Sequence, residues 1–132
     1  MGYDEMSKNK PALEVNETVF QQQVIELAHL YGWKVAHFRA AKTGRTYLNK
    51  KGEVKPVYVT PVQADGVGFP DLVLAKYGKV IFAEVKSENG RLSPEQRGWL
   101  DILASSSCPT YCWRPSDWNE IEGVLESSPV QY

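Results

Sequence analysis

Residues 69–87, FPDLVLAKYGKVIFAEVKS, limit what the chain can fold into more than any other stretch of the sequence. Two apolar runs flank Gly78, a pattern that predicts two strands joined by a tight turn. Apart from the two lysines beside the turn, three charged residues interrupt these runs, with Asp71 at the start of the first strand and Glu84 and Lys86 inside the second. Because side chains alternate along a strand, Glu84 and Lys86 share one face, and Asp71 can lie near Glu84 if the strands pair.

These charges occupy a part of the chain where apolar core is expected. A buried carboxylate is costly unless something compensates it, and two neighbouring carboxylates repel each other. Mg²⁺ is a natural compensation, because it prefers oxygen and is held by one or two carboxylates together with waters and phosphate. Two interpretations stay open on spacing alone. One is a metal site in which Lys86 stabilises charge on a phosphoryl transition state, and the other is an ion pair between Lys86 and Glu84 that only holds the sheet together.

The rest of the chain predicts an α/β protein with a mixed central sheet flanked by helices. Apolar residues recur at helical spacing from Asn16, and Gly32 is placed to end that helix. Ser93 begins a second helix in which Gln96 holds the capping-box position. A strand at residues 110–114 and a final helix follow. Just before Pro70, two glycines at positions 66 and 68 either allow close approach of DNA or metal or simply turn the chain.

The length and net charge of the chain indicate the number of domains but exclude few classes of function. A chain of 132 residues with a net charge of -1 fits one domain, and this charge neither favours nor excludes a nucleic-acid partner. We expect a flexible N-terminal segment at residues 1–15 and a single domain at residues 16–127. No apolar run is long enough to cross a membrane, and the N-terminus lacks the apolar stretch of a signal peptide, so we expect a cytoplasmic location. Cys108 and Cys112 are expected to be free thiols, since no second pair completes a zinc site.

Residues 46–59, TYLNKKGEVKPVYV, predict a β-hairpin with its tip at residues 50–52. Positive charge is concentrated in and around this hairpin. An ordinary solvated loop explains that charge, and so does an arm that grips DNA phosphates. The candidate DNA-binding residues are Arg39, Lys42, Arg45, Lys50, Lys51 and Lys55.

Four stretches resemble the VRR-NUC family, a branch of the PD-(D/E)xK nuclease superfamily: NETVFQQQVIELAHLYGW, GFPDLVLA, VIFAEVKSENGRLSPEQRGWLDIL and TYCWRPSDW. The family pattern is an acidic residue in the first helix, a Pro-Asp pair, a gap, Glu-x-Lys, and a helix that carries a Gln. The resemblance covers residues 17–125. The matching positions in this chain are Glu17, Pro70, Asp71, Glu84, Val85, Lys86 and Gln96.

The resemblance implies a restriction-endonuclease-like PD-(D/E)xK core and a phosphodiesterase that acts on DNA with Mg²⁺ or Mn²⁺. The implied metal ligands are Asp71 and Glu84, with the carbonyl of Val85 as a third and Glu17 binding directly or through a water. Lys86 would be the catalytic lysine. The implied role of Gln96 is to orient Lys86 or a phosphate, and we expect its side chain to cap its helix or reach the site, one at a time.

Small stand-alone members of this family resemble Holliday-junction resolvases and tend to be homodimers, often in phages or prophages. The resemblance therefore implies an endonuclease that resolves four-way junctions as a homodimer, in a bacterial host or a phage-infected cell. The hairpin at residues 46–59 is longer than the family pattern suggests, and we expect it to be a DNA arm or part of the dimer contact. The alternatives are a flap or nicking endonuclease, and a catalytically silent DNA-binding module of the same fold.

Overall fold

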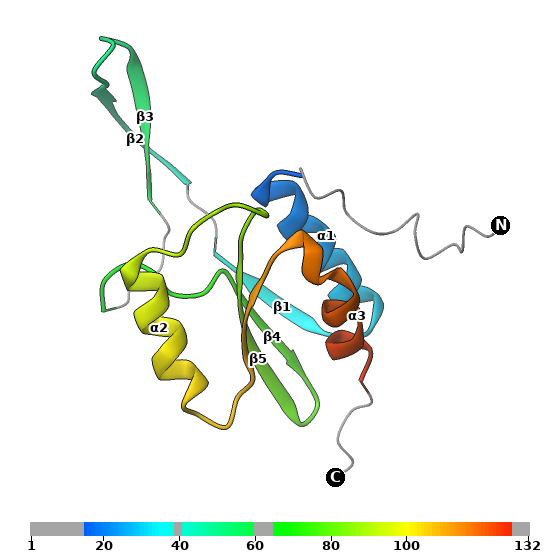
Figure 1. Cartoon of the computed structure of the whole chain (residues 1–132). Helices are drawn as coiled ribbons and strands as arrows, with labels where there is room; N and C mark the ends of the chain where they lie inside the picture. Colours follow the sequence, from blue (N-terminus) through cyan, green and yellow to red (C-terminus); the bar gives the residue numbers. More distant parts are fainter. Residues whose placement is uncertain (1–14, 39–40, 60–64, 128–132) are drawn as a thin grey trace, which may run out of the picture.

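The computed structural model describes residues 15–38, 41–59 and 65–127, and for residues 41–44 and 58–59 it describes only the backbone. The order of elements confirms the predicted α/β class (Figure 1). The elements are α1 (Glu17–Leu30), β1 (Lys34–His37), β2 (Ala41–Leu48), β3 (Val54–Val59), β4 (Leu72–Lys76), β5 (Lys79–Val85), α2 (Pro94–Ala104), β6 (Thr110–Trp113), a 3-10 turn η2 (Pro115–Asp117) and α3 (Trp118–Glu126).

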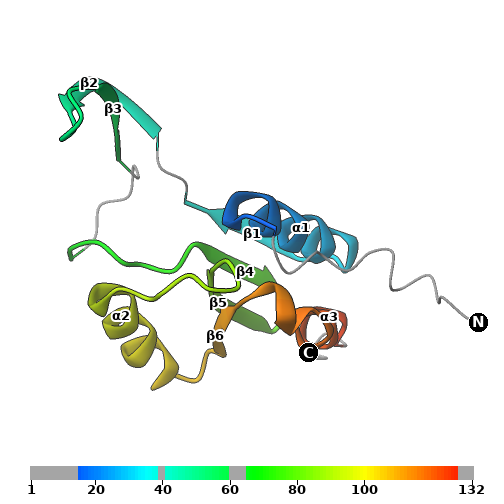
Figure 2. The same cartoon turned by 45° about the horizontal axis from the view of Figure 1, so that its top comes forward.

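The central sheet has four strands in the order β1-β4-β5-β6. The β1–β4 and β4–β5 pairs are antiparallel, whereas β5 and β6 are parallel, so the sheet is mixed as expected. The tight turn between β4 and β5 contains Gly78, whose φ of 83° suits a glycine. Figures 1 and 2 show α1 and α3 on one side of this sheet and α2 on the other.

The main core lies between the sheet and the pair α1 and α3. Apolar residues at alternate positions of β4 and β5 point into it, and each of the following is fully buried: Leu72, Leu74, Ile81, Ala83 and Val85. Phe20 and Val24 of α1 and Ile121 of α3 meet them there. The indole Nε1 of Trp33 donates a hydrogen bond of 2.8 Å to the carbonyl of Leu125, which ties the end of α1 to the end of α3.

The opposite face of the sheet is packed more lightly. Phe69 makes edge-to-face contacts with Phe82 of β5 and with Trp99 of α2, at centroid distances of 6.1 and 5.1 Å. None of the residues of α2 is fully buried, and the side chain of Ile102 is 68% exposed. Packing against α2 therefore contributes less burial than packing against α1 and α3.

The hairpin forms a two-stranded sheet of its own, separate from the central sheet, and it projects from the body of the protein (Figures 1 and 2). The predicted bounds of residues 46–59 were too short. Pairing continues beyond an irregularity between Lys42 and Thr46 as far as Ala41 and Val59. The irregularity breaks strict strand alternation, and for that reason the sequence pattern missed the first residues of β2.

Some expectations fall on residues that the structure does not describe. Residues 1–14, most of the expected flexible segment, are among them, as is Arg39, and of Lys42 only the backbone is described. Within the described ranges Cys108 and Cys112 are free thiols, as expected. No helix in the same ranges has both the length and the apolar character needed to cross a membrane.

Candidate functional site

The pairing of β4 with β5 places Asp71 beside Glu84. Leu72 pairs with Ala83, so Asp71, one residue earlier, comes opposite Glu84. The backbone N–H of Val85 donates a hydrogen bond of 3.0 Å to Oδ2 of Asp71. The carbonyl of Asp71 in turn accepts a 3.1 Å hydrogen bond from the N–H of Phe38, just after β1. Both the main chain and the side chain of Asp71 are therefore held in place by neighbouring strands.

Glu84 is the one charged residue that is fully buried in the described part of the chain, with 1% of its surface exposed. Its Oε2 accepts a hydrogen bond of 3.1 Å from the amide Nε2 of Gln96. Its Oε1 is also buried, and it has no hydrogen-bond partner among the described residues. Burial, and then the neighbouring Asp71 carboxyl group, raise the pKa of Glu84 from 4.5 to about 9. Without metal, the two adjacent carboxyl groups cannot both be ionised at neutral pH, so Glu84 keeps its proton.

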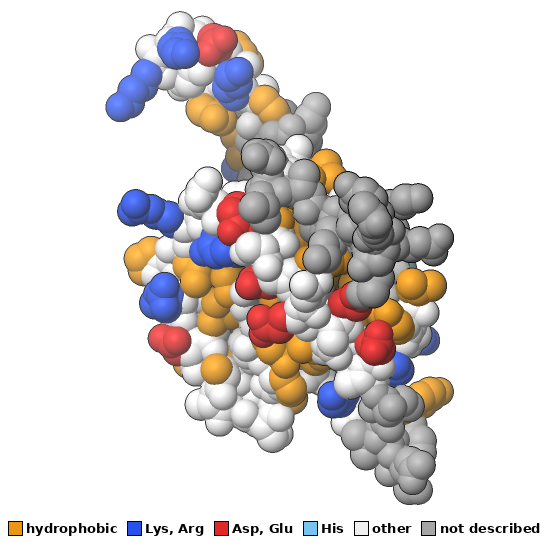
Figure 3. Space-filling model, turned by 45° about the vertical axis from the view of Figure 1, so that its right-hand side comes forward, with side chains coloured by type: hydrophobic (Ala, Val, Ile, Leu, Met, Phe, Trp, Pro, Cys, Tyr) orange, Lys and Arg blue, Asp and Glu red, His pale blue; other side chains and the backbone are white. Residues whose placement is uncertain are grey.

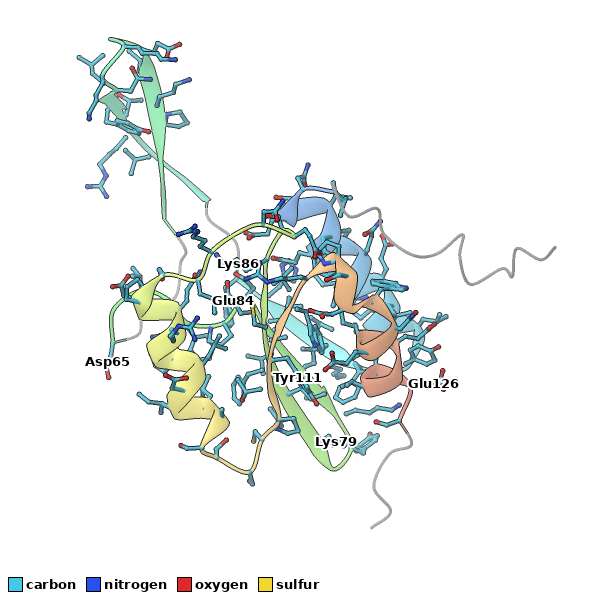
Figure 4. All side chains as sticks on the ribbon, in the orientation of Figure 1. Asp65, Lys79, Glu84, Lys86, Tyr111 and Glu126 are labelled. Atoms are coloured by element: carbon cyan, nitrogen blue, oxygen red, sulfur yellow. The ribbon has the colours of Figure 1, made fainter. Side chains whose placement is uncertain are left out.

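Lys86 follows on the same face of β5, as the alternation predicted. Its Nζ lies 4.0 Å from Oε2 of Glu84 and 4.0 Å from Oε1 of Glu17, and its side chain is mostly buried. The backbone N–H of Lys86 donates a 2.9 Å hydrogen bond to the carbonyl of Trp113 in β6. Figure 4 shows Glu84 and Lys86 close together in the space between the first turns of α1 and α2.

Gln96 caps its helix and contacts Glu84 at the same time, so the expectation of one role at a time was wrong. Its Oε1 accepts a hydrogen bond of 2.9 Å from the N–H of Ser93, which completes the capping box. Its Nε2 donates to Glu84. An amide side chain has an acceptor and a donor end, and the first turn of α2 lies where each end can be used. The capping box thereby fixes the orientation of the group that holds Glu84.

Glu17 reaches the site from the first turn of α1. Asn16 accepts a 2.8 Å hydrogen bond from the N–H of Val19 and so fixes the start of the helix. The side chain of Glu17 is about half exposed, at 47%. Partial burial and the charge of Asp71 raise its pKa, while Lys86 and a backbone hydrogen bond from Ser87 oppose that rise. Glu17 is thus at the rim of the site, in contact with Lys86.

Two residues that the motif does not include also shape the site. Arg114, after β6, donates from Nη1 to the carbonyls of Ser87 and Gly90, at 2.9 and 2.5 Å. These bonds fix the loop that follows Lys86. Each bond joins residues that are more than twenty positions apart in the sequence, and no periodic pattern predicts such a contact.

Gly68 is the second such residue. Its φ is 104°, and a Cβ atom built on it would lie 2.7 Å from the backbone carbon of Glu95 and 2.8 Å from the backbone nitrogen of Gln96. A glycine is therefore required so that the segment leading to Asp71 can pack directly on the first turn of α2. The close approach that Gly68 allows is that of a helix, which neither of the two sequence interpretations of the glycines included.

The basic candidates whose side chains the structure describes lie away from the carboxylates. Arg45, Lys50, Lys51 and Lys55 lie on the hairpin, and all four are exposed. Figure 3 shows a group of Lys and Arg side chains on the projecting hairpin. The structure thus separates a compact acidic site from a basic arm.

The residues of this site fit a divalent cation. Among the described residues no group of three or more His, Cys, Asp and Glu is placed to hold a metal ion. A cation such as Mg²⁺ needs only one or two carboxylates beside waters and phosphate, and Asp71 and Glu84 supply these. A cation bound here would be a partner for the unpartnered Oε1 of Glu84 and would lower the raised pKa of its carboxyl group.

The protonated Glu84 predicts how metal-free stability depends on pH. Between pH 4.5 and about 9 the folded chain keeps a proton on Glu84 that the unfolded chain releases. The contribution of this group to the free energy of unfolding is therefore fully present below pH 4.5 and is lost as the pH rises towards 9. The raised pKa of Glu17 acts in the same direction. We expect Tm, measured in EDTA, to fall by at least about 4 °C from pH 5 to pH 9. Mg²⁺ should raise Tm more at pH 8.5 than at pH 5, because protons compete with the cation. A metal-free Tm that rises with pH would contradict this placement of the proton.

A Gly68→Ala substitution should disturb the site through the backbone. The added Cβ would overlap backbone atoms of α2, which cannot move as a flexible side chain would. We expect a loss of more than about 2 kcal/mol in the free energy of unfolding, measured with urea. Gly66→Ala is the matched control, since Gly66 has a φ of 81° but nothing within 4 Å of the added atom. Equal losses for both variants would show that conformation alone matters and that the contact with α2 does not.

In a scan against protein-family models, residues 19–116 match the VRR-NUC domain. The matched region begins in α1 and ends just after β6, so it includes Asp71, Glu84, Lys86 and Gln96. The chain has no match among curated proteins or among solved structures.

Proposed function

Because the chain belongs to the VRR-NUC domain family and so has a nuclease-type function in DNA processing, we propose that it is a divalent-metal-dependent DNA endonuclease. The observation that carries this proposal is the buried Glu84, which has one unpartnered oxygen and lies beside Asp71 and Lys86. A buried acid of this kind has no evident structural purpose, since a neutral side chain would satisfy Gln96 at lower cost.

The residues that would hold a cation are Asp71 and Glu84. The carbonyl of Val85 is proposed as a third ligand, and Glu17 as a further ligand, directly or through a water. The chemistry that bound Mg²⁺ or Mn²⁺ supplies is polarisation of a phosphoryl oxygen and a lower pKa for a bound water. Gln96 would keep the Glu84 carboxylate in one orientation, and the hydrogen bond from Val85 would do the same for Asp71.

Lys86 is proposed to carry the positive charge that the reaction needs at the phosphate. Its ammonium group lies between Glu84 and Glu17, and its side chain is mostly buried, so it is held in place before substrate arrives. There it would hold the attacking water or stabilise charge that develops on the phosphoryl oxygens. The Arg114 bonds to the loop after Lys86 would keep this arrangement rigid.

We further propose that the preferred substrate is a four-way junction and that the protein acts as a homodimer. The exposed basic residues on the hairpin support contact with DNA outside the site. The light packing of α2 and the exposed Ile102 support a second copy against this helix. Two sites related by a two-fold axis suit paired cuts across a junction. A flap or nicking endonuclease is the alternative substrate class.

Cleavage of labelled DNA tests this function. Four-way junction, flap, nicked and linear substrates would be incubated with Mg²⁺ or Mn²⁺, beside the Glu84→Ala and Lys86→Ala variants. Symmetric cutting of the junction that both variants lack would support the resolvase. Cutting of flaps alone would keep the nuclease and exclude the junction. Folded protein that binds DNA and cuts none of these substrates with either metal would favour the silent binding module.

The oligomeric state is tested separately by sedimentation velocity over a range of protein concentrations. An Ile102→Glu variant should shift a dimer to monomer, because it places a charge on the exposed face of α2. Leu30→Glu is the matched control, since the side chain of Leu30 at the end of α1 is 76% exposed. A monomeric native chain at all concentrations would exclude the homodimer.

A further inference from the structure

The end of the hairpin carries large apolar side chains that are exposed to solvent. Leu48, Val54 and Tyr47 are 70%, 67% and 52% exposed. In the register of β2 and β3, Leu48 is directly opposite Val54, and Tyr47 is opposite Lys55. Because alternate residues face opposite sides, one face of the hairpin end is aliphatic, and the other combines an aromatic ring with a positive charge.

The turn that holds these residues is well defined. Oδ1 of Asn49 accepts hydrogen bonds of 2.9 Å from the N–H groups of Lys51 and Glu53. The N–H of Gly52 donates a 3.0 Å hydrogen bond to the carbonyl of Asn49, and its φ of 81° suits a glycine. A turn built in this way fixes how Leu48 and Val54 are presented.

The hairpin has no core of its own to cover these side chains. It is a separate two-stranded sheet, and such a sheet buries little apolar surface. Apolar side chains clustered at the end of a projecting arm therefore indicate a surface that something else covers.

The charge of the same segment identifies what covers it. Residues 45–55 contain four basic residues and one acidic residue, a net charge of +3, in a chain whose net charge is -1. A symmetric contact between two copies of this segment would bring like charges together. A polyanion is attracted to it instead, and Figure 3 shows basic and hydrophobic side chains together at the end of the arm. DNA offers both partners, phosphates for the lysines and base faces for the apolar side chains.

We propose that the end of the hairpin, residues 45–55, recognises the branch point of branched DNA by contacting bases, a proposal that rests on DNA being the substrate of the proposed function. Tyr47 stacks on a base face that is left unstacked at the branch point, while Lys55 opposite it contacts the adjacent phosphate. Leu48 and Val54 pack against the base pair that is exposed where two arms separate. A branch point supplies such unstacked faces, whereas a continuous duplex does not. The arm therefore adds selectivity for branched DNA to the affinity that its charges provide.

Binding without divalent metal, in EDTA, separates this recognition from cleavage. Affinities would be measured for four-way junction, flap and linear DNA of equal length, with 2-aminopurine at the branch point as a reporter of stacking. The test variant is Tyr47→Ser/Leu48→Ser/Val54→Ser, which keeps every charge. The comparison variant is Lys50→Gln/Lys51→Gln/Lys55→Gln, and Leu30→Ser controls for loss of an exposed apolar side chain elsewhere.

The apolar variant should lose at least about tenfold in affinity for branched DNA, with no change for linear DNA or in salt dependence. The lysine variant should weaken binding to all three DNAs. It should also reduce the slope of log binding constant against log salt concentration by about 2 to 3 in magnitude. An unchanged ratio of branched to linear affinity in the apolar variant would overturn the proposal, even if the protein cuts DNA. Loss of self-association in place of DNA selectivity would overturn it in favour of a second copy. If the native chain neither binds nor cuts any DNA, the proposed function fails as well.

Discussion

A Glu84→Gln variant is expected to lose metal-dependent cleavage while becoming more stable than the native chain in EDTA at pH 8. Glutamine keeps the shape of the side chain and can still accept the hydrogen bond from Gln96. It removes the carboxylate that the proposed cation would need, so we expect the single-turnover cleavage rate to fall at least about 100-fold. The native chain must hold a protonated acid in a buried position, and the neutral amide removes that cost.

The gain in stability has a definite sign. At pH 8 the folded Glu84 is largely protonated and the unfolded one is ionised, because the pKa is about 9 in the fold and 4.5 without it. Each pKa unit corresponds to about 1.4 kcal/mol, so the variant should gain more than about 1 kcal/mol in the free energy of unfolding at this pH. It should also lose most of the stabilisation by Mg²⁺ and most of the pH dependence. The measurements are urea unfolding with and without Mg²⁺ and cleavage of the best substrate.

Glu95→Gln is the matched control for this variant. Glu95 lies in the first turn of α2, next to Gln96, and it is exposed to solvent. The same chemical change there should leave cleavage and the stabilisation by Mg²⁺ within about twofold of the native values. Full cleavage activity in the Glu84→Gln variant would exclude Glu84 as a metal ligand, whatever its effect on stability.

The sheet and its charged residues could be predicted from the sequence because they depend on short-range regularities. Because side chains alternate along β5, Glu84 and Lys86 share a face. The tight turn at Gly78 sets the strand register that brings Asp71 opposite Glu84. The helix caps at Asn16 and Ser93 follow from similarly local rules. Each of these predictions needed fewer than twenty residues of sequence.

The support around these residues could not be predicted in the same way. The second contact of Gln96 depends on where α2 packs against the sheet, and that packing depends on Gly68. The bonds from Arg114 to the loop after Lys86 join segments that lie side by side only because β6 pairs with β5. Tertiary contacts of this kind leave no period in the sequence. They decide how rigidly the site is held, whereas the motif decides only which groups are present.

The geometry also bears on whether Lys86 only pairs with Glu84. One ammonium group lies 4.0 Å from each of two carboxyl groups, and Asp71 adds a third beside Glu84. One positive charge does not neutralise three acids, and burial with the neighbouring Asp71 still raises the pKa of Glu84 to about 9 in its presence. A pair evolved only for stability would match its charges and use shorter contacts. If all three acids were ionised, the cluster would lack positive charge, and a cation would provide it.

A Lys86→Met variant should therefore separate catalysis from stability. Methionine replaces the enclosed aliphatic stem of Lys86 but carries no charge. We expect the cleavage rate to fall about 100- to 10,000-fold, because the positive charge beside the phosphate is lost. Binding of Mn²⁺, measured by calorimetry, should be as tight as in the native chain or tighter, because a charge that repels the cation has gone.

The stability of this variant decides between the two interpretations of the motif. If Glu84 keeps its proton near neutral pH, Lys86 faces a neutral acid there, and its removal should change the free energy of unfolding by less than about 1 kcal/mol. A buried structural ion pair predicts a loss of about 3–5 kcal/mol and no fall in the rate per folded molecule. Lys79→Met is the matched control at the other end of β5, where Lys79 donates a 3.1 Å hydrogen bond to Ser127. The Lys79→Met variant should leave the cleavage rate unchanged. A slower rate in Lys86→Met alone would then show that the reaction needs the positive charge of Lys86.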